Sequence, residues 1–153
     1  MSHFPQAGEV IWIGVRPATR QTIEIVEETY AYIGKGLAGD RYKGNADSKR
    51  QVTLIQAEHL AAIGSYLGQR FINPELLRRN IVVKGINLLA LKEHRIQIGE
   101  AILEMTGLCH PCSRMEEVLG PGGYNAMRGH GGITAKVILE GTIRLGDKVT
   151  IAN

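Results

Sequence analysis

The sequence has few of the features that mark secreted, membrane or disulfide-stabilised proteins. It contains two cysteines in 153 residues, too few for a disulfide framework. The first ten residues, MSHFPQAGEV, lack the basic and apolar regions of a secretory signal. No apolar run approaches the roughly 20 residues that a membrane-spanning helix needs; the longest candidate, AILEMTGLC, is interrupted by Glu104 and Gly107. We therefore expect a cytoplasmic protein without a membrane partner.

Aromatic residues and excess charge are also scarce. Phenylalanine, tryptophan and tyrosine make up 5% of the chain, and the formal net charge is +3. Because no basic stripe is interleaved with aromatic side chains, we expect no nucleic-acid partner. The mild positive charge is compatible with an anionic small molecule. Glycine, in contrast, occurs 19 times, which suits the tight turns and bulges of a strongly curved β structure.

The hydrophobic pattern predicts a mainly β (α+β) protein, namely a mixed, mostly antiparallel β barrel with a few short helices packed around it. The absence of internal repeats and of a linker predicts that residues 1–153 form a single domain. Strands are expected at residues 10–16, 22–28, 51–55, 80–85, 94–99, 101–107, 133–141 and 147–153. Short helices are expected at residues 56–68, 73–79 and 114–119.

Local signals refine these boundaries. The first two strands should form a hairpin, and Asn73 followed by Pro74 should cap the second helix. Ser113 and Glu116 match a capping box for the third helix. Residues 29–50 and 120–132 are glycine-rich and read as long irregular connections, which are often functional.

The segment GKGLAG at 34–39 matches the G-x-G-x-x-G pattern of dinucleotide-binding proteins. In those proteins the pattern leads directly into a helix, whereas here it continues as DRYKGNAD, a sequence unsuited to a helix. We therefore interpret it as a glycine-permitted loop. An anion could still bind the cations of this connection, namely Lys35, Arg41, Lys43, Lys49 and Arg50.

Both cysteines lie in TGLCHPCSRMEEVLG, residues 106–120. With Ser113 as helix N-cap, Cys112 would lie beside the positive end of the helix dipole, which favours a thiolate able to bind a soft metal or attack sulfur. Cys109 ends a strand and fits a structural role. Two ordinary buried cysteines are an open alternative. A redox pair lacks the usual βαβ context.

A zinc site would need two further ligands. His130 is the one plausible histidine nearby in the sequence, since His3, His59 and His94 show no partner spacing. Zinc bound to the cysteines is therefore disfavoured, though not ruled out by the sequence.

Several segments, taken in order, resemble the MOSC domain, the family named after the C-terminal domain of molybdenum cofactor sulfurases. They are GLAGDRYKG, RQVTLIQAEHL, RRNIVVKGINLLAL, IGEAILEMTGLCHPCSRME and RGHGGITAKVILEGTIRLGD. The resemblance covers roughly residues 30–151 and implies a β-rich, barrel-like fold. It also implies that Cys112 carries the chemistry, either as a ligand of molybdenum or as the carrier of a persulfide.

The resemblance further implies a set of residues at the cofactor pocket. Asp40 and Arg41 match the family's GDR loop, and the residue after it, often histidine in the family, is Tyr42 here. No role of that histidine can be transferred. The remaining candidates for cofactor binding are Arg79, Asn80, Arg114 and Arg128.

We accordingly expect a protein that binds the molybdenum cofactor (molybdopterin) and reduces small N-hydroxylated molecules or base analogues. Cys112 would be the metal ligand, and an external protein would donate electrons. One alternative is a sulfur carrier that accepts persulfide on Cys112 from a pyridoxal-phosphate-dependent cysteine desulfurase. Another is a binding module with inert thiols. The sequence fixes neither the substrate nor the oligomeric state.

Overall fold

The computed structural model describes residues 3–18, 22–41, 44, 47–92, 94–110 and 113–152. The strands in this part of the chain are β1 (Gly8–Val15), β2 (Glu24–Val26), β3 (Glu28–Tyr32), β4 (Gly36–Leu37), β5 (Val52–Gln56), β6 (Ile81–Lys84), β7 (Arg95–Ile98), β8 (Ala101–Leu108), β9 (Ile133–Leu139), β10 (Gly141–Arg144) and β11 (Lys148–Ala152). The helices are α1 (Ala57–Tyr66), α2 (Pro74–Leu77), α3 (Ser113–Leu119) and α4 (Gly123–Met127), with a 3-10 helix, η1, at Leu88–Leu91.

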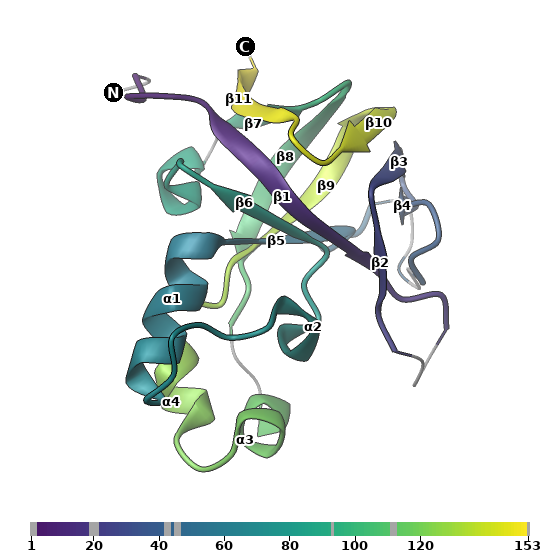
Figure 1. Ribbon diagram of the computed structural model, residues 1–153. Coiled ribbons are helices and arrows are strands. Elements are labelled where there is room, and N and C mark those ends of the chain that lie inside the picture. Colours follow the sequence, from purple (N-terminus) through teal and green to yellow (C-terminus); the bar gives the residue numbers. More distant parts are fainter. Residues whose placement is uncertain are drawn as a thin grey trace.

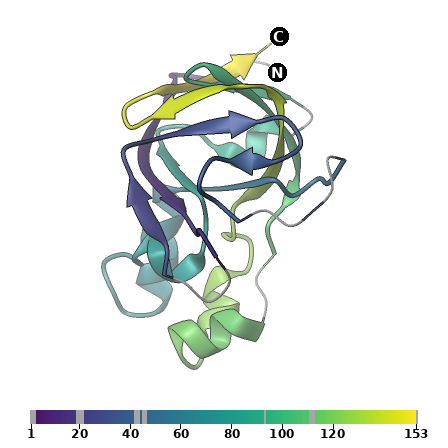
Figure 2. The same ribbon diagram turned by 90° about the vertical axis from the view of Figure 1, so that its right-hand side faces the viewer.

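Seven strands close into a barrel in the order β1-β11-β7-β8-β9-β5-β6, after which β6 pairs with β1 (Figure 2). The pair β5–β6 is parallel, and the other neighbours in the barrel are antiparallel. β2 pairs with the end of β1, and β10, β3 and β4 form a separate small sheet. The predicted fold, a mixed and mostly antiparallel β barrel with a few short helices, is confirmed.

The strands β5 and β6 are buried on both faces, which explains their continuous apolar runs. Leu54 and Ile81 belong to the cluster that fills the barrel, whereas Ile55 and Val82 belong to a second cluster beneath the helices. This second cluster also contains Leu60 and Ile63 of α1, Leu77 of α2, Met115 of α3 and Met127. The helices therefore cover one end of the barrel, opposite the start of β1 and the end of β11 (Figure 1).

Most of the expected local signals are confirmed. β1 and β2 pair as an antiparallel hairpin. The Asn73 side chain accepts a hydrogen bond from the Glu75 amide at 3.1 Å, and Pro74 is the first residue of α2. Within the G-x-G-x-x-G segment itself, residues 36–37 form β4 and residues 38–39 form a turn. None of the helices in the described ranges is both long and apolar enough to cross a membrane.

Three expectations about irregular segments are wrong. The connection 29–50 contains most of β3 and all of β4, the loop 120–132 contains α4, and the link between the last two predicted strands contains β10. These elements are short. β10 pairs with β3 from far earlier in the chain, and the start of α4 donates hydrogen bonds to Glu116 of α3. β4 has two residues and pairs with Ala31 and Tyr32 of β3.

The predicted role of Glu116 in a capping box is also wrong. α3 is described from Ser113 onward. The Glu116 carboxylate instead accepts hydrogen bonds from the amides of Gly122 and Tyr124, both at 2.9 Å. Glu116 thus fastens the start of α4 to α3.

Candidate functional site: an arginine pocket

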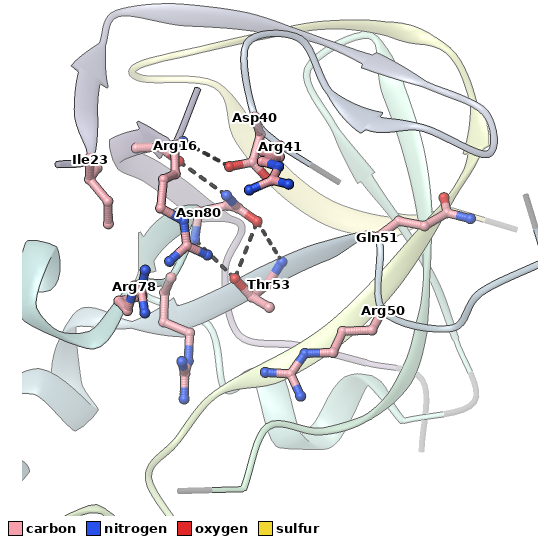
Figure 3. Close-up of a pocket in the computed structure, with 11 residues that line it drawn as sticks. Arg16, Ile23, Asp40, Arg41, Arg50, Gln51, Thr53, Arg78 and Asn80 are labelled. Carbon is pink, nitrogen blue, oxygen red and sulfur yellow. Dashed lines mark hydrogen bonds between the residues drawn. The ribbon is translucent and has the colours of Figure 1, made fainter. Parts of the chain in front are cut away.

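Residues from four separate segments line a cavity of about 150 Å³ (Figure 3). We call it the arginine pocket, because five of its eleven described lining residues are arginines. The lining residues are Gly14, Arg16, Ile23, Asp40, Arg41, Arg50, Gln51, Thr53, Arg78, Arg79 and Asn80.

Asn80 joins the strands beneath the pocket. Its side-chain oxygen accepts hydrogen bonds from the amide and hydroxyl of Thr53 at 3.0 and 3.2 Å, and its side-chain nitrogen donates to the Gly14 carbonyl at 3.1 Å. The Gly14 amide in turn donates to the Asn80 carbonyl at 2.7 Å. Asn80 is 9% exposed, so these bonds satisfy a buried amide and hold the end of β1 against β5 and the start of β6.

Asp40 and Arg41 are fixed to the end of β1 on the other side of the pocket. The Asp40 carboxylate accepts a hydrogen bond from the Arg16 amide at 2.9 Å, and the Arg41 amide donates to the Arg16 carbonyl at 2.7 Å. The GDR loop is therefore anchored through its backbone and through Asp40. Its one carboxylate is engaged by a backbone amide, which leaves the guanidinium groups of Arg16 and Arg41 facing the cavity (Figure 3).

Arg78 has an unusual backbone. It ends α2 with φ 59° and ψ 35°, and it is the one non-glycine residue with positive φ in the described part of the chain. For an L-residue this left-handed conformation costs about 1–2 kcal/mol. It turns the chain sharply from α2 toward β6, which places Arg78, Arg79 and Asn80 in succession on the pocket wall.

Arg79 connects the pocket to the segment that carries the cysteines. It is 6% exposed, and its Nε and Nη1 donate to the carbonyls of Gly131 and Leu77, each at 2.7 Å. A Cβ at Gly131 would lie 2.0 Å from the Cys109 carbonyl oxygen, so only glycine allows these two backbones to touch. The Cys109 amide donates to the carbonyl of Gly132 at 2.8 Å, and Arg50 Nη2 lies 3.6 Å from the Cys109 sulfur.

The ion pairs formed among the described residues lie outside the pocket. Among the described residues, ion pairs form between Arg95 and Glu104 and between Arg144 and Glu28 or Glu100, all outside the pocket. Arg16, Arg41, Arg50 and Arg78 form none within the described residues. A set of guanidinium groups held in this way is suited to bind an anion, above all a phosphate, which accepts paired hydrogen bonds from arginine.

Comparison with known protein families identifies the chain. The family model described as MOSC domain matches residues 38–150. The chain belongs to the MOSC domain family. The matched region includes eight of the eleven residues that line the arginine pocket, the exceptions being Gly14, Arg16 and Ile23.

Comparison with solved structures finds the same fold in small bacterial proteins. YuaD from Bacillus subtilis superimposes with a TM-score of 0.79 and 19% identity, covering 94% of each chain. YiiM from Geobacillus stearothermophilus gives a TM-score of 0.75 and 18% identity over 95% of this chain and 75% of that one. YiiM from Escherichia coli gives 0.73 and 17% over 97% and 71%. A search of curated proteins finds no match.

The MOSC domain brings together some of the residues predicted for its site. Asp40, Arg41, Arg79 and Asn80 all line the arginine pocket. Arg114, in contrast, is exposed on α3, and Arg128 is exposed after α4, where it lines a different hollow. Cys112, the predicted catalytic residue and metal ligand, lies outside the described residues, as does Tyr42. Cys109 is 2% exposed, in line with its predicted structural role.

Sequence reasoning did not assign Arg16, Arg78 or Thr53 to the site. Arg16 ends a strand, and Arg78 directly precedes the predicted Arg79, so adjacency to RRN is the signal that could have identified it. Arg50 was considered only as a cation of the glycine-rich connection. Its place in the pocket depends on how β5 pairs with β6 and β9, which the sequence does not specify.

Proposed function

We propose that this MOSC domain binds the molybdenum cofactor and reduces N–O bonds in small N-hydroxylated molecules. The observation that supports the proposal is the arginine pocket, where Arg16, Arg41, Arg50 and Arg78 line one cavity and form no ion pair with any acid in the part of the chain that the structure describes. Molybdopterin carries a phosphate and a dithiolene group. The pocket fits the phosphate, because arginine offers it planar, permanently charged pairs of donors.

Different residues of this chain would bind different parts of the cofactor. Arg16, Arg41, Arg50 and Arg78 would bind the phosphate, while Asn80 and Asp40 hold the walls on which these arginines stand. Cys112 would supply a thiolate to the metal, since thiolates are soft ligands. The bound cofactor would supply the two-electron redox chemistry. The sequence contains no flavin, iron–sulfur or nicotinamide motif, so electrons would come from a separate protein.

A second candidate function is favoured by the size of the cavity. Its volume of about 150 Å³ is below the roughly 300–1,000 Å³ of common small-molecule sites, and admits a phosphate-sized group more readily than a ring system. This second candidate is a sulfur carrier that has no cofactor of its own. The Cys112 thiolate would attack the terminal sulfur of a desulfurase persulfide, forming a persulfide on Cys112 and releasing the desulfurase thiolate.

Cofactor content tests the first proposal. The wild-type protein would be purified from a host that makes the cofactor, beside Cys112→Ser, Arg41→Gln and the control Arg95→Gln, whose ion pair lies outside the pocket. We expect molybdenum and pterin in the wild type and in the control, and losses of both in Arg41→Gln. Cys112→Ser should lose molybdenum most. Equal contents in all four proteins, or none in the wild type, would contradict the proposal.

Mass spectrometry tests the sulfur-carrier candidate. After incubation with a cysteine desulfurase and cysteine, a carrier gains about 32 Da on Cys112. Cys109→Ser should retain this gain, because its sulfur is buried, whereas Cys112→Ser should lose it. A gain that occurs equally on both cysteines would point to a thiol pair, and no gain in the wild type would exclude a carrier. If both experiments fail, a binding module with inert thiols is the remaining function.

A further inference from the structure

A second polar cluster lies outside the arginine pocket, where the helices cover the barrel. His59 is in the first turn of α1, and His130 follows α4. Their imidazole rings meet edge to face, with centroids 4.8 Å apart and planes inclined by 63°. The sequence spacing did not indicate this contact, because the two residues are far apart in the chain. We call these two residues the histidine pair.

His130 contains a polar atom that the protein buries without satisfying it. Its Nδ1 is shielded from solvent and has no hydrogen-bond partner among the described residues. Leaving such an atom unpaired costs about 1–3 kcal/mol, and an ion is one of the physical reasons for which a folded protein retains one. The neighbouring ring, His59, belongs to the residue type that most often binds metals.

The charges around the histidine pair are mixed. Burial lowers the pKa of His59, repulsion by His130 lowers it further, and Glu58 partly opposes both effects. His59 is thus an uncharged imidazole at neutral pH, which is the form that binds a metal. Tyr66, two turns along α1, places its ring 5.7 Å from that of His130 and brings no charge. Arg128 lines the adjacent hollow.

We propose that the histidine pair binds one divalent transition-metal ion of the zinc type, with water completing its coordination. Two imidazoles bound to one tetrahedral ion at about 2.0–2.1 Å have centroids about 5 Å apart, and the observed separation is 4.8 Å. The separation of the two rings is therefore compatible with one ion held between them. Among the described residues no third histidine, cysteine or carboxylate completes a ligand set, so the affinity should be moderate.

A hollow beside His130 leaves space for further ligands of the ion. A hollow of about 410 Å³ adjoins His130 and is lined also by Tyr66, Gly122, Asn125, Ala126 and Arg128. It has room for metal-bound water or for a small anion, which Arg128 would attract. The site is separate from the arginine pocket, and the proposal does not depend on the function proposed for that pocket.

Calorimetric titration of the full-length protein with zinc chloride at neutral pH tests the site. The variants are His59→Asn and His130→Asn, with His94→Asn as the matched control and Cys109→Ser and Cys112→Ser to identify binding by thiols. We expect one ion per chain, weakened about tenfold or more in either variant of the pair because one of two protein ligands is lost. The control and the cysteine variants should retain it.

Three outcomes would overturn the proposal. They are zinc binding that persists in both histidine variants, zinc binding that is lost in a cysteine variant, and no zinc binding by the wild type. The absorption spectrum of the wild-type protein with bound cobalt provides a second test, which does not depend on whether the variants fold. Cobalt bound by imidazole and water shows weak visible bands, whereas cobalt bound by cysteine adds an intense sulfur-to-metal band in the near ultraviolet. Weak bands alone support the histidine pair, and the sulfur band contradicts it.

Discussion

Arg78 combines an unfavourable backbone conformation with a place on the wall of the arginine pocket. Its φ of 59° is the kind that a helix usually ends on with glycine, which has no Cβ to clash. Arginine at this position supplies a guanidinium group at a cost in stability. Such a combination is typical of functional sites, where a strained residue is retained for what its side chain does.

Replacement of Arg78 by glycine should therefore separate stability from binding. Arg78→Gly removes about 1–2 kcal/mol of strain but adds about 0.5–1 kcal/mol of chain entropy, so we expect stability to be unchanged or slightly higher. Pyrophosphate serves here as a simple probe for a phosphate group in the pocket. The affinity of the protein for pyrophosphate should fall about tenfold or more, because a charge-assisted hydrogen bond is lost. Urea denaturation and calorimetry measure the two effects. Arg78→Ala, which keeps the strain, should lose affinity without the gain in stability that glycine gives, and a strongly destabilised glycine variant would refute this account.

At the scale of elements, the contact between α3 and α4 depends on one carboxylate. The pKa of Glu116 is lowered from its usual value of 4.5, first by the hydrogen bond from the Tyr124 amide and then by that from Gly122. Because the folded-state pKa is the lower one, the contribution of Glu116 to stability is present above pH 4.5 and is lost as the pH falls through the folded-state pKa.

Glu116→Gln should lower the melting temperature at neutral pH, since the amide presents one acceptor and no charge. As the pH falls through the folded-state pKa, the gap between variant and wild type should narrow, because the wild-type carboxyl becomes protonated and loses its charge. Glu117→Gln, on the same helix, is the control and should show no such change with pH. Thermal unfolding followed by circular dichroism gives both values, and a gap that widens in acid would contradict the assigned role.

The loop that contains Gly131 holds Arg79 and Cys109 in place together. Gly131→Ala would force a methyl group toward the Cys109 carbonyl, 2.0 Å away, at a cost of about 1–3 kcal/mol. Because the Gly131 carbonyl accepts from Arg79, the variant should also bind pyrophosphate more weakly. Gly129→Ala is the matched control, since it has positive φ but open space around its Cβ. It should lose stability through strain while keeping the wild-type affinity, as calorimetry can measure.

The elements that the sequence predicted are those whose signals are local. The helix start at Asn73 and the β1–β2 hairpin each follow from neighbouring residues. The helix α4 was missed because its sequence, GYNAM, opens on glycine and the amides at its start donate to Glu116 of the preceding helix. An element that depends on a partner far away in the chain carries no local pattern, and β10, which pairs with β3, is of this kind.

At the scale of the whole molecule, the arginine pocket is a product of topology. Arg16, Arg41, Arg50 and Arg78 come from segments far apart in the sequence, which the pairing of β1 and β5 with β6 draws to one place. Family resemblance located Arg79, Asn80 and the GDR loop, because these belong to recognisable motifs. Charge composition could not locate the other arginines of the pocket, since a net charge of +3 does not indicate which cations lie close together in the fold.

This convergence of like charges predicts how the folded protein responds to anions. Unneutralised guanidinium groups repel one another across the pocket, and unfolding separates them. An anion that binds there stabilises the folded state by about 2.7 kcal/mol at 100 times its dissociation constant. For a chain of this size, that corresponds to a rise of about 5–10 °C in melting temperature.

Pyrophosphate should produce this rise, whereas sodium chloride at equal ionic strength should produce much less. Arg95→Gln, whose ion pair is elsewhere, should respond as the wild type does. A variant with Arg16, Arg41 and Arg50 all changed to glutamine should lose most of the response, and an undiminished rise in that variant would place the anion at another site.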